Sequence, residues 1–324
     1  MAKLATIKDP IKEEMRNFND YFKKSMKSTT PLLNIITNFI LKTKGKQMRP
    51  MLVFLSAGMH GKINDATYHA AALIELMHTA TLTHDDVVDD SNFRRGFFSI
   101  NALWKNKIAV LIGDYLLARG LLLSVKHKEF ELLEVVSTAV DQMSQGELLQ
   151  IEKSRKLNID ESIYFKIIEQ KTATLIAACA KAGAKSVNAP EAAVADMETF
   201  GMHLGMAFQI KDDLFDYEPS GITGKPSGND IKEKKLTLPL IYAKNQLDTA
   251  SRRAVLKLLK KKNKSKSEVA QIIETVKKYG GIEYARDVML NYKNKALAIL
   301  DKYPESEYSH SLKEIVSYTV ERKK

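Results

Sequence analysis

Two short acidic clusters, far apart in the chain, carry the residue types best suited to chemistry. Each has the pattern Asp-Asp-x-x-Asp: the first runs from Asp85 to Asp89 and the second from Asp212 to Asp216. On a helix, the first and last aspartates of a cluster stand four residues apart, so their side chains lie on one face. Like charges at that spacing repel, and a divalent cation between the clusters would offset the repulsion. Hard oxygen ligands that leave room for phosphate oxygens suit magnesium.

Basic residues accompany both acidic clusters. Arginine presents a planar fork to phosphate oxygens and lysine presents a point charge, so cations beside metal-binding carboxylates indicate a polyphosphate site. The simpler alternative is ordinary surface ion pairing between each aspartate and a neighbouring cation. Two matching clusters, each followed by cations, favour the polyphosphate site. The cations are Arg94 and Arg95 after the first cluster, Lys225 and Lys235 after the second, and Lys46 and Arg49 upstream of both.

Helices are the elements expected to position these residues. The chain has 324 residues, 44% of them hydrophobic, and its 15 glycines and 8 prolines are few for a turn-rich β fold. Residues 68–78 and 108–118 are largely apolar around the helical circumference, which is typical of buried helices in a large bundle. We therefore expect a single all-α domain over 1–324 with a central cavity. The longest loop, 218–228, directly follows the second cluster and is a candidate lid.

A Lys-rich stretch accounts for much of the net charge of +11. Blocks of like charge mostly face water, and the sharper alternatives are an anionic membrane surface or a nucleic acid. No zinc-ligand, aromatic RNA-binding or basic-zipper pattern supports nucleic acid. The N-terminus lacks the apolar run of a signal peptide, and no uninterrupted apolar stretch approaches the roughly 20 residues of a membrane span, so we expect a cytoplasmic protein. The cations of the stretch are Arg252, Arg253, Lys257, Lys260, Lys261, Lys262, Lys264 and Lys266.

Further motifs resemble the polyprenyl synthetase family of trans-isoprenyl diphosphate synthases. The resemblance extends over nearly the whole chain, and its motifs follow the family's order. An isolated Asp-Asp-x-x-Asp would be a weak signal, whereas this combination is specific. The motifs are Gly45-Lys46-x-x-Arg49-Pro50, His84-Asp85-Asp86-x-x-Asp89-Asp90 with Arg94-Arg95-Gly96, Gly113-Asp114-Tyr115, Gly146-Glu147, Lys171-Thr172, Phe208-Gln209 before Asp212, Gly224-Lys225 and Lys235-x-Thr-x-Pro239.

The resemblance implies an isoprenoid-synthase helical bundle and a prenyltransferase activity. Isopentenyl diphosphate would condense head-to-tail with an allylic diphosphate, such as farnesyl or geranylgeranyl diphosphate. The product would be a long-chain all-trans polyprenyl diphosphate, a precursor of a quinone side chain. Three Mg²⁺ ions per active site are implied, with Mn²⁺ as a substitute. Their ligands would be Asp85, Asp86, Asp89, Asp212, Asp213 and Asp216.

The resemblance also implies positions for both substrates. The allylic diphosphate would face Arg94, Lys171, Lys225 and Lys235, and oxygens near Lys171 and Thr172, together with Gln209, would stabilise the carbocation. Isopentenyl diphosphate would bind Lys46, Arg49, His78 and Arg95 without a metal. A proton would leave to the released diphosphate, so no protein nucleophile is required. For His78 the alternative is a hydrogen-bonded core histidine, and His84 is expected behind the metal ligands rather than among them.

Product length is expected to depend on residues one to two turns before the first cluster. Met77, Ala80 and Thr81 would face the cavity below Asp85, each turn adding about 5.4 Å. Shorter-chain relatives carry Phe or Tyr at the positions of Ala80 and Thr81, so the small residues here predict a product above the 20-carbon class. The alternatives are a stop on another helix and a short-chain (farnesyl or geranylgeranyl) synthase.

Two departures from the family pattern and three rival functions complete the prediction. Phe97-Phe98-Ser99 replaces a Pro-containing turn, and Lys105 stands where relatives commonly have glycine, which affects loop geometry.

A terpene cyclase would not need Lys46, Arg49 and Arg95, and the intact acidic clusters disfavour a non-catalytic subunit of a two-component synthase. A membrane or nucleic-acid module would leave the clusters unexplained. The resemblance implies a homodimer, with peripheral membrane contact through the product and no nucleic-acid partner.

Overall fold

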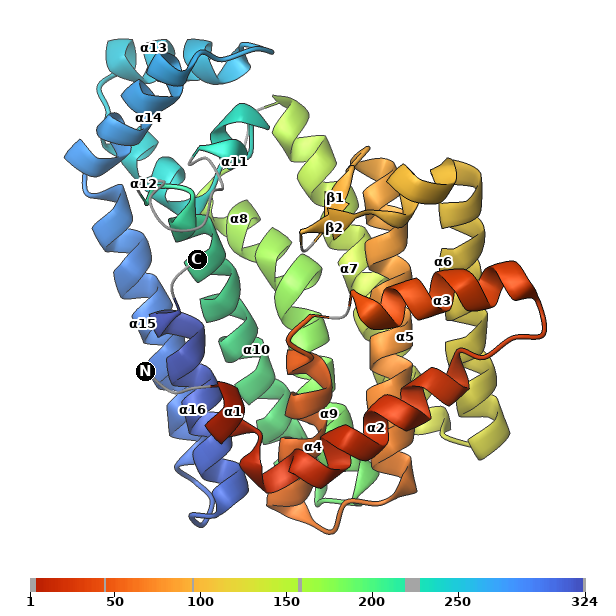
Figure 1. The fold of residues 1–324 in the computed structure, drawn as a ribbon. Helices are drawn as coiled ribbons and strands as arrows, with labels where there is room; N and C mark the ends of the chain where they lie inside the picture. Colours follow the sequence, from red (N-terminus) through yellow and green to blue (C-terminus); the bar gives the residue numbers. More distant parts are fainter. Residues whose placement is uncertain (1–3, 44, 95, 157–158, 219–227, 323–324) are drawn as a thin grey trace.

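Long helices make up almost all of the described chain. The structure is a computed structural model, and it describes residues 4–43, 45–94, 96–156, 159–218 and 228–322 (Figure 1). The expected all-α fold class is confirmed. The elements are α1 (Leu4–Ile7), η1 (Asp9–Ile11), α2 (Lys12–Ser25), α3 (Pro31–Lys42), α4 (Met48–His60), α5 (Asp65–Val88), β1 (Phe93–Arg94), β2 (Phe97–Phe98), α6 (Ile100–His127), α7 (Phe130–Lys156), α8 (Glu161–Ile168), η2 (Glu169–Ala173), α9 (Thr174–Ser186), α10 (Glu191–Phe215), α11 (Asn229–Lys232), α12 (Leu238–Gln246), α13 (Thr249–Lys260), α14 (Lys266–Lys278), α15 (Gly281–Leu300) and α16 (Glu307–Glu321).

Two groups of buried apolar residues hold the helices together. The larger group joins residues of α2, α4, α5, α6, α7, α9 and α16 with the first half of α10. The smaller group joins α8, the second half of α10 and α12 to α15. Helix α10 contributes to both groups, so it connects the two halves of the bundle. The candidate lid at 219–227 lies outside the described residues, and the expected single domain stays a prediction.

Each acidic cluster lies at the C-terminal end of a long central helix. Helix α5 begins with a capping box, in which the side chain of Asn64 accepts from the Thr67 amide at 3.3 Å, and Asp89 is its C-cap. Helix α10 begins after Pro190, and Asp216 is its C-cap. Both helices end at the same end of the bundle (Figure 1). The partial negative charge of a helix C-terminus adds to the repulsion among the carboxylates there, so nearby cations are required.

A small hairpin after the first cluster was not expected from the sequence. Strands β1 and β2 are antiparallel, with Phe93 opposite Phe98 and Arg94 opposite Phe97. Gly96 in the turn has a φ of 83°, a conformation that side chains other than glycine rarely adopt. The rings of Phe93 and Phe98 lie 4.8 Å apart. The hairpin brings Arg94 back toward the aspartates that precede it.

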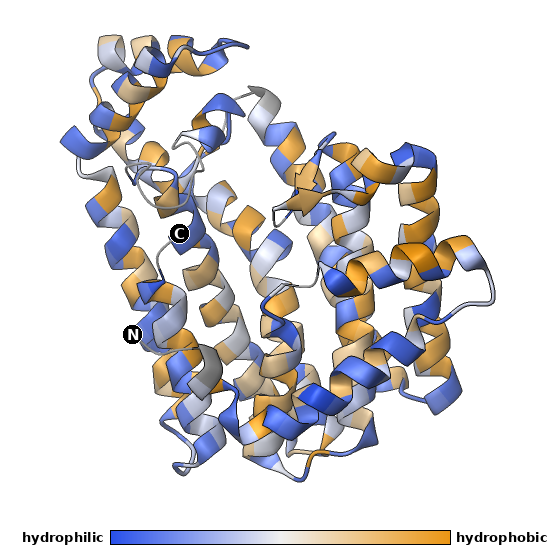
Figure 2. Cartoon of the chain, in the orientation of Figure 1, coloured by the Kyte–Doolittle hydropathy of each residue, from blue (hydrophilic) through white to orange (hydrophobic). Residues whose placement is uncertain are grey.

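Helix α6 is unusually apolar. By length and composition alone, it is the one helix in the described chain that is long and apolar enough to cross a membrane. Charged residues such as Asp114 and Arg119 interrupt it, so it is not an uninterrupted apolar stretch. Its most apolar window is 33% buried, and the helix packs along α5 as a member of the bundle. Figure 2 shows extended orange stretches on α6 at the edge of the bundle. An exposed apolar surface therefore remains on this helix.

Lys105 interrupts the regular backbone near the start of α6. Its φ of 68° and ψ of 165° are non-helical and fall in a region that is nearly exclusive to glycine. This position is the one at which the sequence departs from the family's usual glycine. The departure therefore introduces local backbone strain.

We predict that Lys105→Gly stabilises the protein by about 1 kcal/mol, because relief of the strain exceeds the extra entropy of glycine in the unfolded chain. The free energy of unfolding, measured by urea denaturation, reports the change. Lys107→Gly is the matched control, since exposed Lys107 is regularly helical and glycine there should cost about 1 kcal/mol. Equal destabilisation by both substitutions would contradict the prediction.

Candidate active site

The first cluster combines a buried aspartate with two more accessible ones. Asp86 is 3% exposed, and its Oδ1 accepts a hydrogen bond from Nε of Arg94 at 2.7 Å. Burial raises the pKa of Asp86, and the contact with Arg94 partly offsets this. The pKa of Asp85 is also raised. Burial is the largest cause and the repulsion of Glu147 is the next, whereas Lys171 and Arg94 lower it. Asp89 is exposed at the helix end. Asp85 and Asp89 are thus the members of this cluster left open toward a ligand.

In the second cluster, each aspartate has a different partner. Asp213 is buried and accepts hydrogen bonds from the Tyr164 hydroxyl at 2.7 Å and from Nε2 of Gln209 at 2.8 Å. Burial, followed by the negative charge of Asp230, raises the pKa of Asp213 to about 7. Asp216 is also buried, and its two oxygens accept from the backbone N–H groups of Asn229 at 2.8 Å and Asp230 at 3.0 Å. Asp216 therefore fixes the start of α11.

Asp212 is held from the other end of the chain. Its Oδ1 accepts a hydrogen bond from Nη2 of Arg322 at 2.6 Å, and the same guanidinium lies 4.0 Å from the ring centroid of Phe208. Burial lowers the pKa of Arg322, and the charge of Asp212 partly offsets the shift. Arg322 thus supplies a positive charge at a position where a metal ion is expected.

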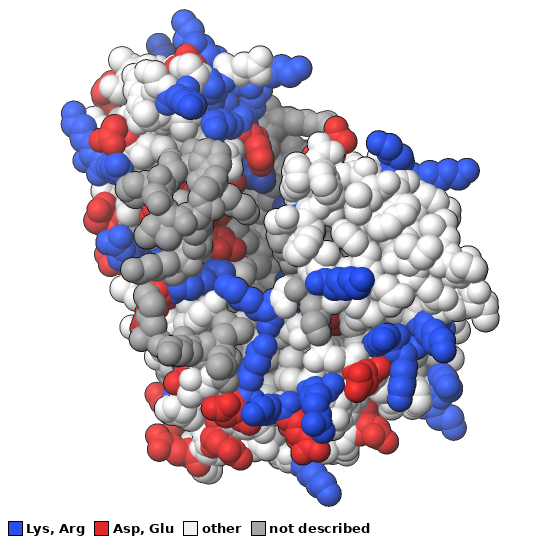
Figure 3. All heavy atoms as spheres, viewed as in Figure 1, with Lys and Arg blue, Asp and Glu red and all other residues white. Residues whose placement is uncertain are grey.

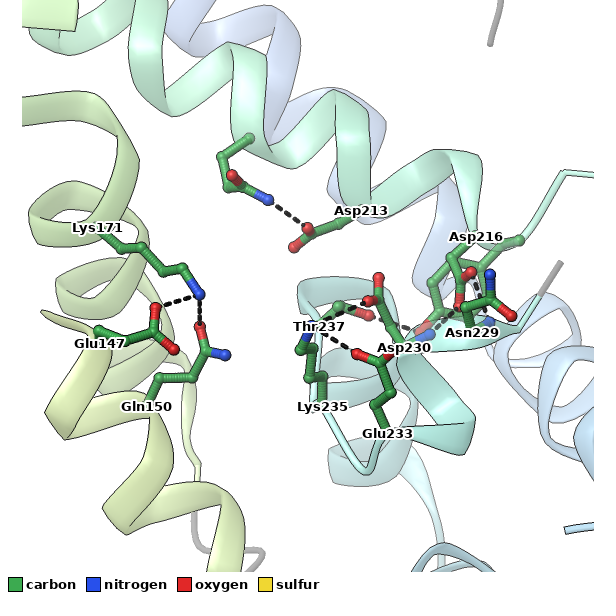
Figure 4. A network of polar contacts seen from close by, with 12 residues as sticks. Glu147, Gln150, Lys171, Asp213, Asp216, Asn229, Asp230, Glu233, Lys235 and Thr237 are labelled. Carbon is green, nitrogen blue, oxygen red and sulfur yellow. Dashed lines mark hydrogen bonds and ion pairs between the residues drawn. The ribbon is translucent and has the colours of Figure 1, made fainter. Parts of the chain in front are cut away.

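Asp230 is a site residue that sequence reasoning missed. It lies beside Asp216, and its Oδ1 is 4.0 Å from Nζ of Lys235, which also pairs with Glu233 (Figure 4). Burial raises the pKa of Asp230 to about 6, with the charge of Asp216 as the next cause. The second cluster therefore has a fourth carboxylate. Its only sequence signal is an aspartate between the loop and Lys235, with no repeated spacing to reveal it.

The predicted carbocation-stabilising residues form a connected polar chain. The Thr172 hydroxyl donates to Oε1 of Gln209 at 2.8 Å, and Gln209 in turn donates to Asp213. Lys171 pairs with Glu147 and donates to Oε1 of Gln150 at 3.3 Å. Lys171 and Thr172 lie in the π-helical turn η2, a local widening of the helix that is frequent at functional sites. Tyr164, Glu147 and Gln150 had no predicted role, because only tertiary contacts show their partners.

A cavity of about 230 Å³ separates the Lys171 side from the second cluster. In Figure 4, Lys171 faces the group formed by Asp230, Glu233 and Lys235 across an open space. A mixed lining of carboxylates, amides and cations suits a metal-bound polyphosphate. Residues of the lining include Lys171, Thr172, Gln209, Asp212, Asp213, Asp230 and Lys235.

A second cavity, of about 520 Å³, is lined by cations and apolar side chains. It contains Lys46 and Arg49, as the sequence predicted for a metal-free phosphate site. Nζ of Lys46 donates to the Tyr318 hydroxyl at 2.8 Å. Arg322 lines this cavity and also contacts Asp212, so it joins the two cavities. Tyr318 and Arg322 were missed because they lie near the C-terminus, outside any motif.

Some predicted residues are elsewhere or are not described. His78 is buried on α5 and is absent from the described linings of both cavities, so its contact with isopentenyl diphosphate stays a prediction. His84 packs on α6: its Nε2 lies 3.5 Å from Asp114, and a side chain at Gly113 would collide with its ring. Arg95 and Lys225 lie outside the described residues.

The predicted chain-length residues lie on α5 below the first cluster. Met77 and Ala80 are buried, and the Thr81 hydroxyl donates to the His78 carbonyl at 2.9 Å. A Cβ at Gly120 of α6 would stand 3.3 Å from the Met77 sulfur, so α5 and α6 approach each other closely at this level. The effect of these three residues on product length stays a prediction.

The donor set fits a metal ion that arrives with its phosphate ligand. Among the residues that the structure describes, no three His, Cys, Asp or Glu side chains converge into a metal-binding group. Magnesium usually takes one or two carboxylates and completes its shell with water and substrate phosphates, whereas a protein-only cage is less common. Aspartates with raised pKa values are carboxylates whose negative charge lacks compensation. Asp85, Asp89 and Asp212 are at least partly accessible, and their assignment as ligands of such an ion stays a prediction.

Comparison with known proteins decides the family. A sequence model described as polyprenyl synthetase matches residues 30–276. The chain belongs to the polyprenyl synthetase family. The resemblance predicted from the motifs is therefore confirmed, and the matched range contains both acidic clusters.

Curated relatives and solved structures of this family cover nearly the whole chain. The chain is 34% identical over 317 residues to the all-trans-nonaprenyl-diphosphate synthase (geranyl-diphosphate specific) of Rhodobacter capsulatus, covering 97% of this chain and 96% of that protein. It is 34% identical over 284 residues to heptaprenyl diphosphate synthase component 2 of Geobacillus stearothermophilus, covering 87% and 88% of the two chains.

Two solved structures of the family are similar to this fold. A polyprenyl synthase from Caulobacter crescentus, complexed with calcium and isoprenyl diphosphate, has a TM-score of 0.90 and 30% identity, covering 99% of this chain and 98% of that one. A geranylgeranyl pyrophosphate synthase from Bacteroides thetaiotaomicron has a TM-score of 0.84 and 39% identity, covering 98% and 99%. The family structure from Caulobacter thus pairs a hard divalent cation with an isoprenyl diphosphate.

We predict that Asp213→Asn stabilises the metal-free protein at pH 8 and has little effect at pH 4. The pKa of Asp213 is about 7 when folded, against 3.8 as the ordinary value. Between those values the unfolded chain releases the proton and the folded chain keeps it, so this carboxyl lowers stability progressively as pH rises from 4 to 7. The asparagine cannot ionise, and we expect a gain of roughly 1–3 kcal/mol at pH 8.

Urea denaturation of the metal-free protein at both pH values measures the difference. Asp141→Asn serves as the control, because Asp141 is exposed on α7 and should show no such pH dependence. A stability gain for Asp213→Asn that is equal at both pH values would show that burial of its negative charge is not the cause.

Proposed function

We propose that this chain is a magnesium-dependent trans-prenyltransferase that condenses isopentenyl diphosphate head-to-tail with an allylic diphosphate. The product is a long-chain all-trans polyprenyl diphosphate, of a class suited to a quinone side chain. One observation carries the proposal: a carboxylate-lined cavity lies next to a separate cationic cavity, and Arg322 contacts both. Two adjacent phosphate sites, with carboxylates at one of them, match a reaction between two diphosphates.

The first cavity binds the allylic diphosphate and prepares it to leave. Asp85, Asp89 and Asp212 would hold magnesium, which would supply Lewis-acid neutralisation of the leaving diphosphate. Lys171 and Lys235 lie on opposite sides of the same cavity and add positive charge where the negative charge develops. For this, Lys171 must exchange its contact with Glu147 for phosphate oxygens.

The polar chain below the diphosphate directs oxygens toward the allylic carbons. Gln209 donates to Asp213 and accepts from Thr172, so its side-chain oxygen is held in one orientation. Asp213 keeps that orientation because Tyr164 occupies its second oxygen. Ordered oxygen dipoles stabilise a developing carbocation without forming a bond to it. The proposed mechanism requires no protein nucleophile, because these oxygens stabilise the carbocation without bonding to it.

The second cavity supports the binding of isopentenyl diphosphate. Lys46 and Arg49 supply the positive charge, and Phe208 provides an apolar wall beside them. A terpene cyclase has no second diphosphate to bind, so this cavity favours a condensing enzyme. The relative from Geobacillus is a component 2 by name, which keeps a two-component synthase as a candidate alternative. Activity of the purified single chain separates the two.

Product length is tested by chromatography of the products made from farnesyl diphosphate, isopentenyl diphosphate and Mg²⁺. We expect the wild type to release products longer than 20 carbons. Ala80→Phe should shorten them, because the resemblance implies that a large ring at this position blocks the growing tail, as in shorter-chain relatives. Ala139→Phe is the matched control, since Ala139 is equally small and buried but lies on α7. Products of unchanged length from Ala80→Phe would overturn the prediction that residues just before the first cluster limit product length.

The same assay distinguishes the rival functions. Product formation without isopentenyl diphosphate would indicate a terpene cyclase, and inactivity of the single chain would indicate a two-component enzyme. Wild-type products of 20 carbons or fewer would indicate a short-chain synthase, a class that includes the similar structure from Bacteroides. Loss of all activity on removal of Mg²⁺ is expected, with recovery on addition of Mn²⁺.

We also propose that the chain forms a homodimer through α6. Apolar side chains that are 41% to 60% exposed recur along one face of this helix. Figure 3 shows few charged side chains on the α3 and α6 side of the molecule. Burial against a second copy would remove this surface from water. The exposed large apolar residues on α6 are Leu103, Val110, Leu111, Leu121, Leu122 and Val125.

We predict that Leu111→Glu combined with Leu122→Glu yields a monomer, because burial of two unpaired carboxylates at the interface would be unfavourable. Light scattering after size-exclusion chromatography measures the mass, which should halve. Leu290→Glu is the control, since Leu290 is 38% exposed on α15, away from this face. A double variant that keeps the wild-type mass, or a monomeric wild type, would contradict an interface at α6.

The expected cytoplasmic location stays a prediction.

A further inference from the structure

The Lys-rich stretch forms an exposed cationic surface at one end of the molecule. It comprises α13, the turn after it and the first residue of α14, and it contains eight cations and no acidic residue from Arg252 to Lys266. Figure 3 shows a concentration of blue side chains over α13 and α14, at the top of the view. We refer to α13, this turn and α14, which together carry the eight cations, as the basic hairpin.

Three of the eight cations have structural partners. Arg252 donates to the carbonyl groups of Lys244 and Leu247, which close the end of α12. Lys261 pairs with Glu268, and Nζ of Lys264 donates to the carbonyl of Lys232 at 3.3 Å. These contacts anchor the basic hairpin to the rest of the protein.

The other five cations are exposed and available to a partner. No hydrogen bond or ion pair joins their side chains to the residues that the structure describes. Three of them recur on α13 at helical spacing, so they share one face of that helix. A surface of several uncompensated lysines strongly favours a polyanion. The five are Arg253, Lys257, Lys260, Lys262 and Lys266.

The underside of the basic hairpin is already occupied by its own core. Val255 and Leu259 of α13 and Val269 and Ile272 of α14 are buried in the smaller apolar group. Capping fixes both helices: Asp248 accepts from the amides of α13, and Ser265 and Glu268 form a capping box for α14. The basic hairpin is therefore a rigid platform that presents charge and keeps its apolar residues inside.

This platform contacts the second acidic cluster through α11. A Cβ at Gly228 would stand 2.2 Å from Cγ1 of Val269, so the backbone at Gly228 lies directly against α14. The Gly228 amide donates to the carbonyl of Asp216 at 2.9 Å, and Lys232 at the end of α11 accepts from Lys264. In Figure 1, α11, α13 and α14 lie at the end of the bundle where α5 and α10 terminate. The cationic surface and the catalytic cavity thus share one end of the molecule.

We propose that the basic hairpin docks this enzyme on the anionic surface of a lipid bilayer. The choice of occupant rests on the proposed function, because a long-chain polyprenyl diphosphate is an amphiphile whose tail is insoluble in water. Electrostatic docking without insertion fits a platform whose apolar residues are buried. A single-stranded nucleic acid is disfavoured because residues 249–267 contain no aromatic side chain on which bases would stack.

The test is co-sedimentation of the full chain with lipid vesicles. Vesicles of phosphatidylcholine alone are compared with vesicles that also contain phosphatidylglycerol. We expect binding to the anionic vesicles only, with loss of binding at high salt. The triple variant Lys257→Gln, Lys260→Gln and Lys262→Gln should bind roughly a hundredfold more weakly, at about fivefold for each cation removed.

The matched control removes the same charge from another surface. Lys23→Gln, Lys24→Gln and Lys27→Gln alter three exposed lysines on or just after α2 and should leave vesicle binding unchanged. Equal weakening by both triple variants would overturn the proposal, because net charge alone would then explain the binding. Absence of binding to anionic vesicles would also overturn it, as would stronger binding of duplex DNA through the same lysines.

Prenyl-transfer activity, measured in detergent solution, separates this proposal from the proposed function. None of the substituted lysines lines either cavity, so both triple variants should keep wild-type activity in detergent. An inactive wild type that still binds anionic vesicles through the basic hairpin would refute the proposed function and leave the docking surface supported. An active enzyme that does not bind anionic vesicles would support the proposed function and refute the docking surface.

Discussion

Repulsion among carboxylates at the ends of two helices is the constraint on which the rest of the site depends. Helices α5 and α10 end at the same end of the bundle, and each carries its aspartates where the helix dipole is also negative. Burial raises the pKa values of Asp85, Asp86 and Asp213, so the protein alone compensates their charges incompletely. An incompletely compensated set of oxygens is suited to a divalent cation that arrives with a phosphate.

The surrounding structure distributes this charge among partners of different kinds. Arg94 balances Asp86 through a direct hydrogen bond, and Arg322, the C-cap of the last helix, does the same for Asp212. Neutral groups hold Asp213, and backbone amides of α11 hold Asp216. Asp86, Asp213 and Asp216 are buried, whereas the long side chain of Lys171 is partly exposed and is able to exchange Glu147 for a ligand. The buried aspartates are therefore more confined than this lysine.

Local pattern was sufficient to predict the helical fold and several of the charged and polar residues that line the two cavities, but not most of their lining. Aspartates at i and i+4 share a helix face wherever the helix lies, so both clusters were predicted from their spacing alone. Asp230 and Arg322 were not predicted, because each becomes part of the site only through a contact between distant segments. The short hairpin that carries Arg94 was also missed, since strands of two residues leave no periodic signal.

The sequence by itself determined the chemistry available: two sets of carboxylates, the cations that follow them and the apolar helices that carry them. Composition and spacing are properties of the chain, and they limit which ions and phosphates it suits. Only the tertiary structure decided which aspartate is buried, which one supports α11 and which one Arg322 reaches. Those outcomes depend on how α10, α11 and α16 pack, because burial and distance set both pKa and partner. The same packing placed the basic hairpin beside the catalytic end of the molecule.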